Sequence, residues 1–345
     1  MKTTKPATVT AATVTAAAET APVTALGPTR FSGPWFRQLL IDNAMVVVMV
    51  LVIMFFLYRS ARFGTPENLV TILVAAAPFA LIALGQTLVI LTGGIDLSVG
   101  SVIAASAMAG ALTAKTNPDQ IWLALVVAVL VGLLAGLVNG LVVAYMKVPP
   151  FIATLGMMTL ASGIAYVIGN GAPINGLPAG FGAFANTEVL GVKIPVILMI
   201  VSIVGLAIVM KRTAYGMRVY AVGGNRLAAE IAGVNSSRIL LSVYAISGVL
   251  AGLSGIMIAS RVISGAPNLG SGYELDAIAA VVIGGASLMG GRGSIWGTAL
   301  GLLLIQTLNN GFDLLVVPAY WQDVIKGILI VAAVAVDVWA SKHRK

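Results

Sequence analysis

Long, uninterrupted apolar runs constrain the fold of this chain more than any other feature of its sequence. Two examples are Asn43–Tyr58 and Ile121–Ala144, in which apolar residues follow one another without alternating with polar ones. Inside a lipid bilayer, backbone N–H and C=O groups must hydrogen-bond within the protein, so only helices and closed barrels cross it. Barrel strands alternate apolar and polar residues, which these runs do not do. The runs therefore predict transmembrane helices.

The overall composition agrees with a membrane protein. Of the 345 residues, 59% are hydrophobic and 9% are charged, and the mean hydropathy is +1.02. A soluble domain carries about 25% charged residues, so this chain lacks the charge to cover itself with a solvated surface. We predict an all-α, polytopic integral membrane protein whose main surroundings are the lipid bilayer.

Several classes of chemistry are excluded by what the sequence lacks. The chain has no cysteine, and its single histidine, His343, lies in a basic C-terminal tail. It also has no glycine-rich phosphate loop, no zinc-binding His-Glu-x-x-His motif and no nucleophile elbow. We therefore expect a protein that is not an enzyme and that holds no cofactor or metal. The net charge of +8 is typical of basic residues held on the cytoplasmic side of a membrane protein, so no nucleic-acid partner is expected.

Apolar segments of about 20 residues, the length that crosses about 30 Å of hydrocarbon, divide the chain. We place ten of them, at 39–58, 68–91, 96–114, 121–145, 150–169, 192–211, 239–260, 273–290, 294–312 and 320–338. The second and third segments, and the eighth and ninth, meet at glycine-rich junctions at 91–100 and 284–293, where broken or re-entrant helices are the alternative. Residues 1–38, rich in Thr, Ala and Pro, are predicted to be a disordered cytoplasmic tail, and 39–340 the membrane domain.

Basic residues set the predicted orientation of the spans. If both termini are cytoplasmic, 14 of the 20 lysines and arginines lie on the cytoplasmic side. This excess is what the positive-inside rule requires. One cytoplasmic loop, at 211–238, carries more of these basic residues than any other.

Glycines at four-residue spacing predict where two helices pack closely. Gly132, Gly136 and Gly140 share one face of the fourth span, and Gly248 and Gly252 share one face of the seventh. Small residues let helix backbones approach one another in a bilayer. These faces are therefore predicted helix-packing grooves, with a solute path as the alternative.

Three acidic residues lie close to the glycine junctions or begin an apolar segment. Asp96 follows a pair of glycines, and it either caps the next helix or contacts a solute. Glu274 and Asp276 begin an apolar segment, where they are either favourably placed at a positive helix terminus or form a polar rim at the outer mouth of a path. The pattern Gly-Gly-x-x-Leu occurs at both 93–97 and 284–288, which is either a faint internal repeat or a chance match in a glycine-rich sequence.

A short amphipathic helix is predicted inside the loop at 211–238. Asn225 is a good N-cap and Gly233 a good stop. Leu227 and Ile231 are four residues apart and therefore share one face of this helix. An exposed helix with an apolar face either docks on a soluble partner or lies on the lipid surface.

Five segments of the chain are long, ordered motifs. They are ILTGGIDLSVGS at 90–101, PPFIATLGMMTLASG at 149–163, GGNRLAAEIAGVNSSRI at 223–239, GYELDAIAAVVIGGASLMGGRGS at 272–294 and LNNG at 308–311. Together they resemble the ribose-type sugar permeases of bacterial ATP-binding-cassette importers, over about residues 60–338. The resemblance implies a second permease copy in a homodimer, a cytoplasmic ATPase subunit, a periplasmic sugar-binding protein and a location in the bacterial inner membrane.

The resemblance also implies that the segment within 211–238 couples the permease to the ATPase. The residues it points to are Asn225, Leu227, Ala228, Glu230, Ile231 and Gly233. The family's motif reads E-A-A-x3-G, whereas here the acid, Glu230, follows the two alanines. This displacement leaves the docking contacts open.

We therefore expect a permease subunit that carries a ribose-like pentose or a hexose, with ATP hydrolysed by a separate subunit. Polar residues in the apolar segments are the candidates for its path: Gln86, Thr87, Asp96, Asn139, Glu274, Asp276, Asn309 and Asn310. Hydrogen bonds between helices are the alternative role for the amides and the hydroxyl. The alternative function is a secondary transporter of a small polar solute, driven by an ion gradient, in which the three acids would relay protons or hold Na⁺.

Overall fold

A computed structural model describes residues 44–328, 331 and 335 of the chain. The chain divides into two units, Met1–Ala44 and Met45–Lys345. The predicted tail at 1–38 lies outside the described residues, as does most of the chain after residue 328. Apart from Ala44, the described residues all belong to the second unit.

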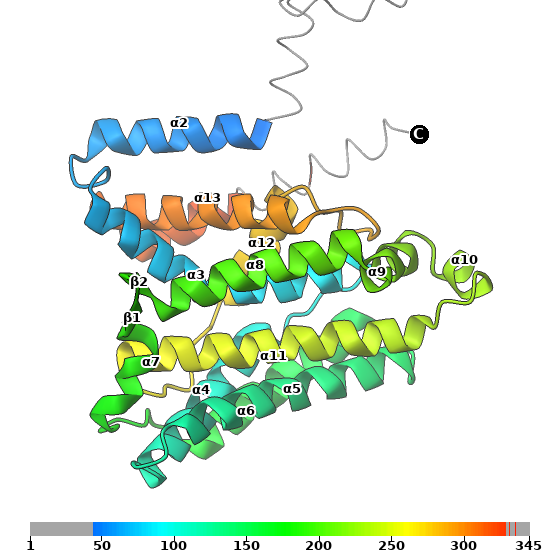
Figure 1. Cartoon of the computed structure of the whole chain (residues 1–345), viewed down its shortest axis with the longest axis horizontal. Coiled ribbons are helices and arrows are strands. Elements are labelled where there is room, and N and C mark those ends of the chain that lie inside the picture. The colour runs from blue at the N-terminus through cyan, green and yellow to red at the C-terminus, as the bar shows by residue number, and fades with distance from the viewer. Residues whose placement is uncertain (1–43, 329–330, 332–334, 336–345) are drawn as a thin grey trace, which may run out of the picture. The chain divides into compact units, whose positions relative to one another are not determined.

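The described part of this unit is built almost entirely from helices, which confirms the all-α prediction (Figure 1). Its long helices are α2 (Ala44–Arg59), α3 (Pro66–Leu91), α4 (Val99–Thr116), α5 (Trp122–Ala144), α6 (Pro150–Ile168), α8 (Ile194–Arg212), α11 (Ser236–Val262) and α13 (Ile295–Leu314). Its shorter elements are η1 (Ala179–Gly182), α7 (Ala183–Asn186), α9 (Ala214–Gly224), α10 (Arg226–Ile231), α12 (Tyr273–Ile283) and the strands β1 (Glu188–Val189) and β2 (Val192–Lys193). Residues 319–328 are also helical.

Six described helices are long and apolar enough to cross a membrane, namely α3, α4, α5, α6, α8 and α11. The apolar part of α2 is shorter. Each of the ten predicted segments overlaps a helix, but the eighth, predicted at 273–290, ends early because α12 stops at Ile283. Gly285 follows with a φ of +85°, which favours glycine and ends the helix. The broken-helix alternative therefore describes this segment.

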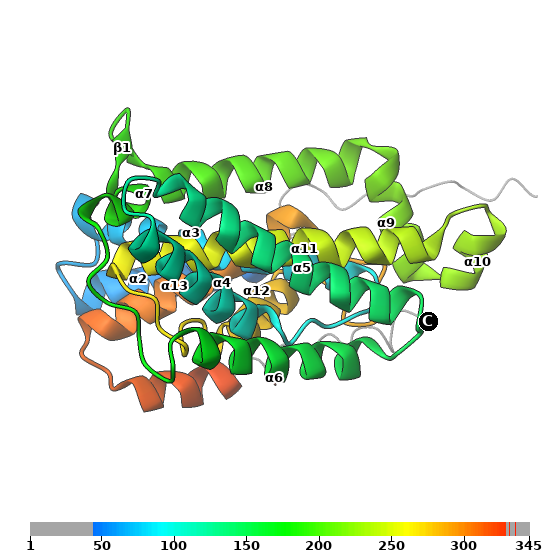
Figure 2. The same cartoon turned by 90° about the horizontal axis from the view of Figure 1, so that it is seen from below.

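The glycine faces of α5 and α11 pack against each other, as predicted. The two helices lie side by side (Figures 1 and 2). A Cβ atom on Gly132 would overlap the carbonyl oxygen of Gly248, and one on Gly248 would overlap that of Gly132. Absent side chains on both helices thus bring the two backbones into direct contact.

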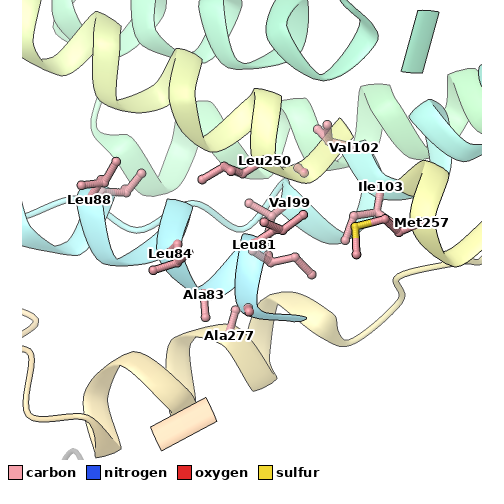
Figure 3. Close-up of a cluster of buried hydrophobic side chains, with 14 of the residues drawn as sticks. Leu81, Ala83, Leu84, Leu88, Val99, Val102, Ile103, Leu250, Met257 and Ala277 are labelled. Atoms are coloured by element: carbon pink, nitrogen blue, oxygen red, sulfur yellow. The ribbon is translucent and has the colours of Figure 1, made fainter. Parts of the chain in front are cut away.

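The hydrophobic core lies where α3, α4 and α11 meet, with α12 on one side (Figure 3). Leu81 and Leu88 of α3, Ile103 of α4 and Met257 of α11 are all 2% exposed or less. Burial inside the protein distinguishes α3, α4 and α11, where most residues are buried, from α5, α6 and α8, where only a minority are. Asp96 lies in the interruption between two of these buried helices, α3 and α4, whereas Glu274 and Asp276 lie in the first turn of α12.

Two ends of this helical unit can be distinguished. The hairpin of β1 and β2 lies at one end, and α9 and α10 lie at the other (Figure 1). At the hairpin end, the segment 263–272 that follows α11 is tied to the segment after α6 by a bridge between Ile174 and Gly265. Under the predicted orientation, the hairpin end is external and the α10 end is cytoplasmic.

Candidate functional site

The first interruption, between α3 and α4, is organised by the buried carboxylate of Asp96, which is 2% exposed. One carboxylate oxygen accepts hydrogen bonds from the Ser98 backbone N–H at 2.9 Å and from its hydroxyl at 2.6 Å. The other oxygen accepts a bond from the Ser247 hydroxyl of α11 at 3.3 Å. The carboxylate therefore has partners on both oxygens and holds the start of α4 against α11.

Two further predicted path residues hold the same interruption. The Gln86 side chain is fully buried. With its amide assigned in the orientation that satisfies both of its polar atoms, it donates to the Asp96 carbonyl oxygen at 3.1 Å and accepts from the Asp96 N–H at 3.2 Å. Asn139 of α5 donates to the Ser98 hydroxyl at 2.9 Å. Gln86, Asp96 and Asn139 line neither the pocket that contains Glu274 nor the pocket beside α10.

The remaining amide and hydroxyl candidates lie between α3 and α13. The hydroxyls of Thr87 and Thr298 are 2.8 Å apart. Asn310 and Asn68 exchange two side-chain hydrogen bonds of 2.9 Å each. Asn309 buries its Oδ1 with no hydrogen-bond partner among the described residues. Thr87 and Asn310 thus make the interhelical bonds that were the alternative to a path role.

One predicted path residue, Glu274, does line a pocket. The pocket has a volume of about 350 Å³ and lies among the start of α4, the middle of α6 and the segment before α12. Its lining residues are Gly100, Ser101, Ala104, Met158, Thr159, Ser162, Tyr166, Pro267, Asn268, Leu269, Ser271 and Glu274. We call this the Glu274 pocket.

Sequence reasoning missed the other polar residues of the Glu274 pocket. On α6, Thr159, Ser162 and Tyr166 all line it. They occur at positions i, i+3 and i+7, which is the spacing of one helix face. A polar stripe on an otherwise apolar span is the signal that would have identified them.

Asp276 is close to Glu274 in sequence but belongs to a different group of charges. Its carboxylate forms a salt bridge of 3.5 Å with Lys326, which also pairs with Asp323 at 3.0 Å. Glu274 takes part in none of the salt bridges found among the described residues. The two acids therefore differ, because one is neutralised by a lysine and the other faces a cavity.

At the opposite end, three glycine-rich segments meet backbone to backbone. We call this contact among residues 91–94, 223–224 and 290–293 the glycine junction. Gly291 donates its N–H to the Leu91 carbonyl oxygen at 2.9 Å, and the Tyr220 hydroxyl donates to the Gly293 carbonyl oxygen at 2.9 Å. The two helix interruptions and the end of α9 are thereby joined.

The predicted short helix after α9 is present as α10. The Asn225 side chain accepts a hydrogen bond from the Ala228 N–H at 3.0 Å, and Gly233 has a φ of +86°, so both predicted helix ends are confirmed. Leu227 and Ile231 are 69% and 80% exposed. This exposed apolar face fits both predicted roles, docking on a soluble partner and lying on the lipid surface.

A second pocket, of about 490 Å³, lies beside α10. Its lining residues are Thr92, Gly93, Gly94, Val143, Lys147, Val148, Pro149, Pro150, Val222, Arg226, Glu230 and Leu240. Arg226 and Glu230 form a salt bridge of 3.1 Å across one turn of α10. This hydrogen bond from Arg226 lowers the pKa of the exposed Glu230 carboxyl. No group of three or more His, Asp or Glu residues in the described part of the chain is placed to hold a metal ion.

Interrupted helices, a polar pocket within the membrane domain and an exposed capped helix at one end define a multi-pass membrane permease. Residues 68–334 match the family model described as the branched-chain amino acid transport system / permease component. The chain belongs to this family of transport permeases. The family resemblance inferred from the motifs is therefore confirmed.

Named relatives are similar over most of their length. The ribose import permease protein RbsC of Bacillus subtilis (strain 168) is 46% identical over 279 residues, which cover 80% of this chain and 86% of that protein. RbsC of Escherichia coli (strain K12) is 40% identical over 320 residues, or 91% and 98% of the two chains. The D-allose transport system permease protein AlsC of the same strain is 37% identical over 296 residues, or 86% and 91%. No solved structure matches this chain.

Proposed function

We propose that this chain is the permease subunit of an ATP-binding-cassette importer and that it carries a monosaccharide, a ribose-like pentose or a hexose, across the bacterial inner membrane. Relatives covering most of the chain carry names of ribose and allose transport. The structural observation that carries the proposal is α10, a six-residue helix capped at both ends and exposed on its apolar face.

The α10 helix has the properties of a docking element for the ATPase subunit. A helix of six residues is too short to be stable in water without caps and packing. Ala229 supplies the packing, because it is buried while Leu227 and Ile231 are exposed. The exposed pair would insert into a groove of the ATPase as helix-in-groove anchors do.

The contacts behind α10 offer a route for the energy of ATP hydrolysis. The α10 helix follows α9 after a single residue, Asn225, and α9 ends in the glycine junction. That junction touches the residues just before Asp96 and those just after α12. A displacement of α10 by the ATPase would therefore reach both helix interruptions through backbone contacts, without flexible side chains in between.

The second permease copy and the sugar-binding protein complete the proposed complex. The α6 helix exposes large apolar side chains such as Phe151, Ile152 and Leu160. On the same helix, Gly156 and Gly163 have open space where a Cβ would lie, which suits close approach by another helix. The sugar-binding protein would dock at the end that carries the β1–β2 hairpin, and both termini would be cytoplasmic.

The experiment is to replace Leu227 and Ile231 by Asp in the full permease and to ask whether its ATPase subunit co-purifies and drives sugar uptake. We expect both to be lost, because two carboxylates would be buried in an apolar groove. Leu190→Asp is the matched control, since Leu190 is 99% exposed in the hairpin at the other end. This variant should retain the ATPase.

The alternative, an ion-gradient-driven transporter, predicts that uptake does not need the ATPase. Uptake in vesicles that lack the ATPase but maintain an ion gradient would overturn the importer proposal. The surroundings of Asp96 do not favour this alternative, because both of its carboxylate oxygens are already hydrogen-bonded.

A further inference from the structure

The Glu274 pocket has a lining that restricts the chemistry of any solute it can hold. Its volume of about 350 Å³ falls in the range of about 300–1,000 Å³ that is typical of small-molecule sites. Among its lining residues are one carboxylate, several hydroxyls and one primary amide, and there is no lysine or arginine. An amino acid would bring a carboxylate that needs a cationic or strongly donating partner, which this lining does not offer. A neutral polyhydroxylated solute needs only hydrogen-bond acceptors and donors.

The carboxylate of Glu274 lies against the backbone of Gly100, where there is no side chain to displace it. A Cβ atom on Gly100, in the first turn of α4, would overlap Glu274 Oε2. Asp276 has a lysine partner, whereas Glu274 has no salt bridge among the described residues. Glu274 therefore presents a positioned acceptor to the cavity.

The α6 face of the pocket supplies complementary groups. The Thr159 hydroxyl donates to the Leu155 carbonyl oxygen at 3.2 Å, which leaves its oxygen able to accept a further bond. Ser162 lies one turn away, and Tyr166 lies one turn beyond that. An aromatic ring beside hydroxyls can cover the apolar face of a sugar ring while the hydroxyls bond its polar edge.

We propose that the Glu274 pocket binds a neutral monosaccharide during transport, with the Glu274 carboxylate accepting hydrogen bonds from sugar hydroxyls and the polar face of α6 bonding the opposite edge. This inference rests on the proposed function and adds the place and the chemistry of solute contact. It also separates the two substrate classes that the family description and the relatives' names suggest, because the pocket suits a sugar and not an amino acid.

The absence of cysteine from the chain allows a direct test of occupancy. Ser162→Cys places a single thiol in the Glu274 pocket of the full permease in complex with its ATPase. The rate of its reaction with N-ethylmaleimide is measured alone and with D-ribose, D-allose, D-galactose or L-leucine. We expect at least one sugar to slow the reaction about threefold or more, while leucine leaves it unchanged. Thr187→Cys, which is exposed and outside the pocket, should react at one rate throughout.

Substitutions test the same site by transport. Glu274→Gln should lower sugar uptake below saturation about tenfold, the loss expected for hydrogen bonds to a charged acceptor. Thr159→Val should lower uptake severalfold. Thr113→Val is its matched control, because Thr113 makes the same bond to the carbonyl oxygen four residues earlier, at 2.8 Å, but lies outside the pocket. Melting temperatures of all variants distinguish a lost contact from a lost fold.

The outcomes distinguish the site from the function. If the native complex imports none of the three sugars, the proposed function fails. If it imports one of them but no sugar protects the Ser162→Cys thiol and the Glu274→Gln variant transports normally, the importer stands and the proposed site is wrong. Protection by leucine equal to that by the sugars overturns the assignment of the solute class.

Discussion

Gly291 donates its backbone N–H to the carbonyl oxygen of Leu91 at 2.9 Å, which bonds the second helix interruption to the end of α3 just before the first. Gly223 fits between them at the end of α9, and a Cβ atom on it would overlap the Leu91 carbonyl oxygen. Backbone contacts of this kind transmit a displacement from one segment to the next, because no side chain lies between them that could rotate to absorb it. The glycine junction is therefore a rigid connection between α9, which leads into α10, and the two helix interruptions.

A methyl group at the glycine junction should uncouple the permease. In Gly223→Ala the segments must separate, so we expect ATP-driven uptake to fall at least tenfold while ATPase binding through α10 is retained. The control is Gly224→Ala, because a Cβ at that adjacent position meets nothing within 4 Å. Uptake into proteoliposomes checks the prediction, and equal uptake by the two variants would contradict it.

A methyl group at the contact between α5 and α11 should lower the free energy of unfolding of the protein. Gly248→Ala would overlap the Gly132 backbone, and overpacking of this kind costs about 1–3 kcal/mol. Gly205→Ala on α8, where a Cβ has open space, should be neutral or stabilising because alanine favours a helix over glycine. Thermal unfolding of both purified variants decides between these outcomes.

The pair of Asn68 and Asn310 should contribute to stability and not to the choice of solute. A double-mutant cycle with alanine at both positions should give a coupling free energy of about 0.6–2 kcal/mol, as for other hydrogen bonds between membrane helices. The relative uptake of ribose, allose and galactose should not change, because neither residue lines the Glu274 pocket. If Asn310→Ala changes the relative uptake of the three sugars, Asn310 contacts the solute and this prediction is wrong.

Acid should weaken the binding of the ATPase to α10 only at unusually low pH. The hydrogen bond from Arg226 lowers the pKa of Glu230, so Glu230 is ionised when folded at pH values where the free side chain begins to protonate. The stabilisation of folded α10 by the ionised Glu230 carboxylate is present above the ordinary pKa of about 4.3. It is lost as the pH falls through the lowered pKa of the folded protein. ATPase binding should therefore be flat from about pH 8 to pH 5, both in the native permease and in Glu230→Gln. A midpoint above pH 5 in the native protein alone would contradict this.

Features encoded by neighbouring residues could be predicted from the sequence. The caps of α10 at Asn225 and Gly233 are local, because each depends on a few adjacent backbone groups. The glycine faces of α5 and α11 could also be predicted, since four-residue spacing on a helix does not depend on the partner. The glycines before Asp96 also predicted that it lies near a helix start, but the N-cap of α4 is Ser98, and the Asp96 carboxylate bonds Ser98 instead of capping the helix itself.

Features that depend on residues distant in sequence could not be predicted. Asn68 and Asn310 are 242 positions apart, and the residues around each of them do not indicate which residue is its partner. The Glu274 pocket likewise combines α4, α6 and the segment before α12, which are brought together only by helix packing. An isolated polar residue in an apolar span is compatible with both a path and a bond between helices, so sequence alone leaves that choice open.

The shortness of α12 has a consequence for how the protein enters the membrane during synthesis. With 11 residues and a rise of 1.5 Å per residue, the helix is about 16 Å long, roughly half the thickness of the hydrocarbon layer. The insertion machinery cannot release it into lipid as a finished span. We expect α12 to stay at the translocon until α13 has been made, so that α12 and α13 are integrated as one unit against the already inserted α3.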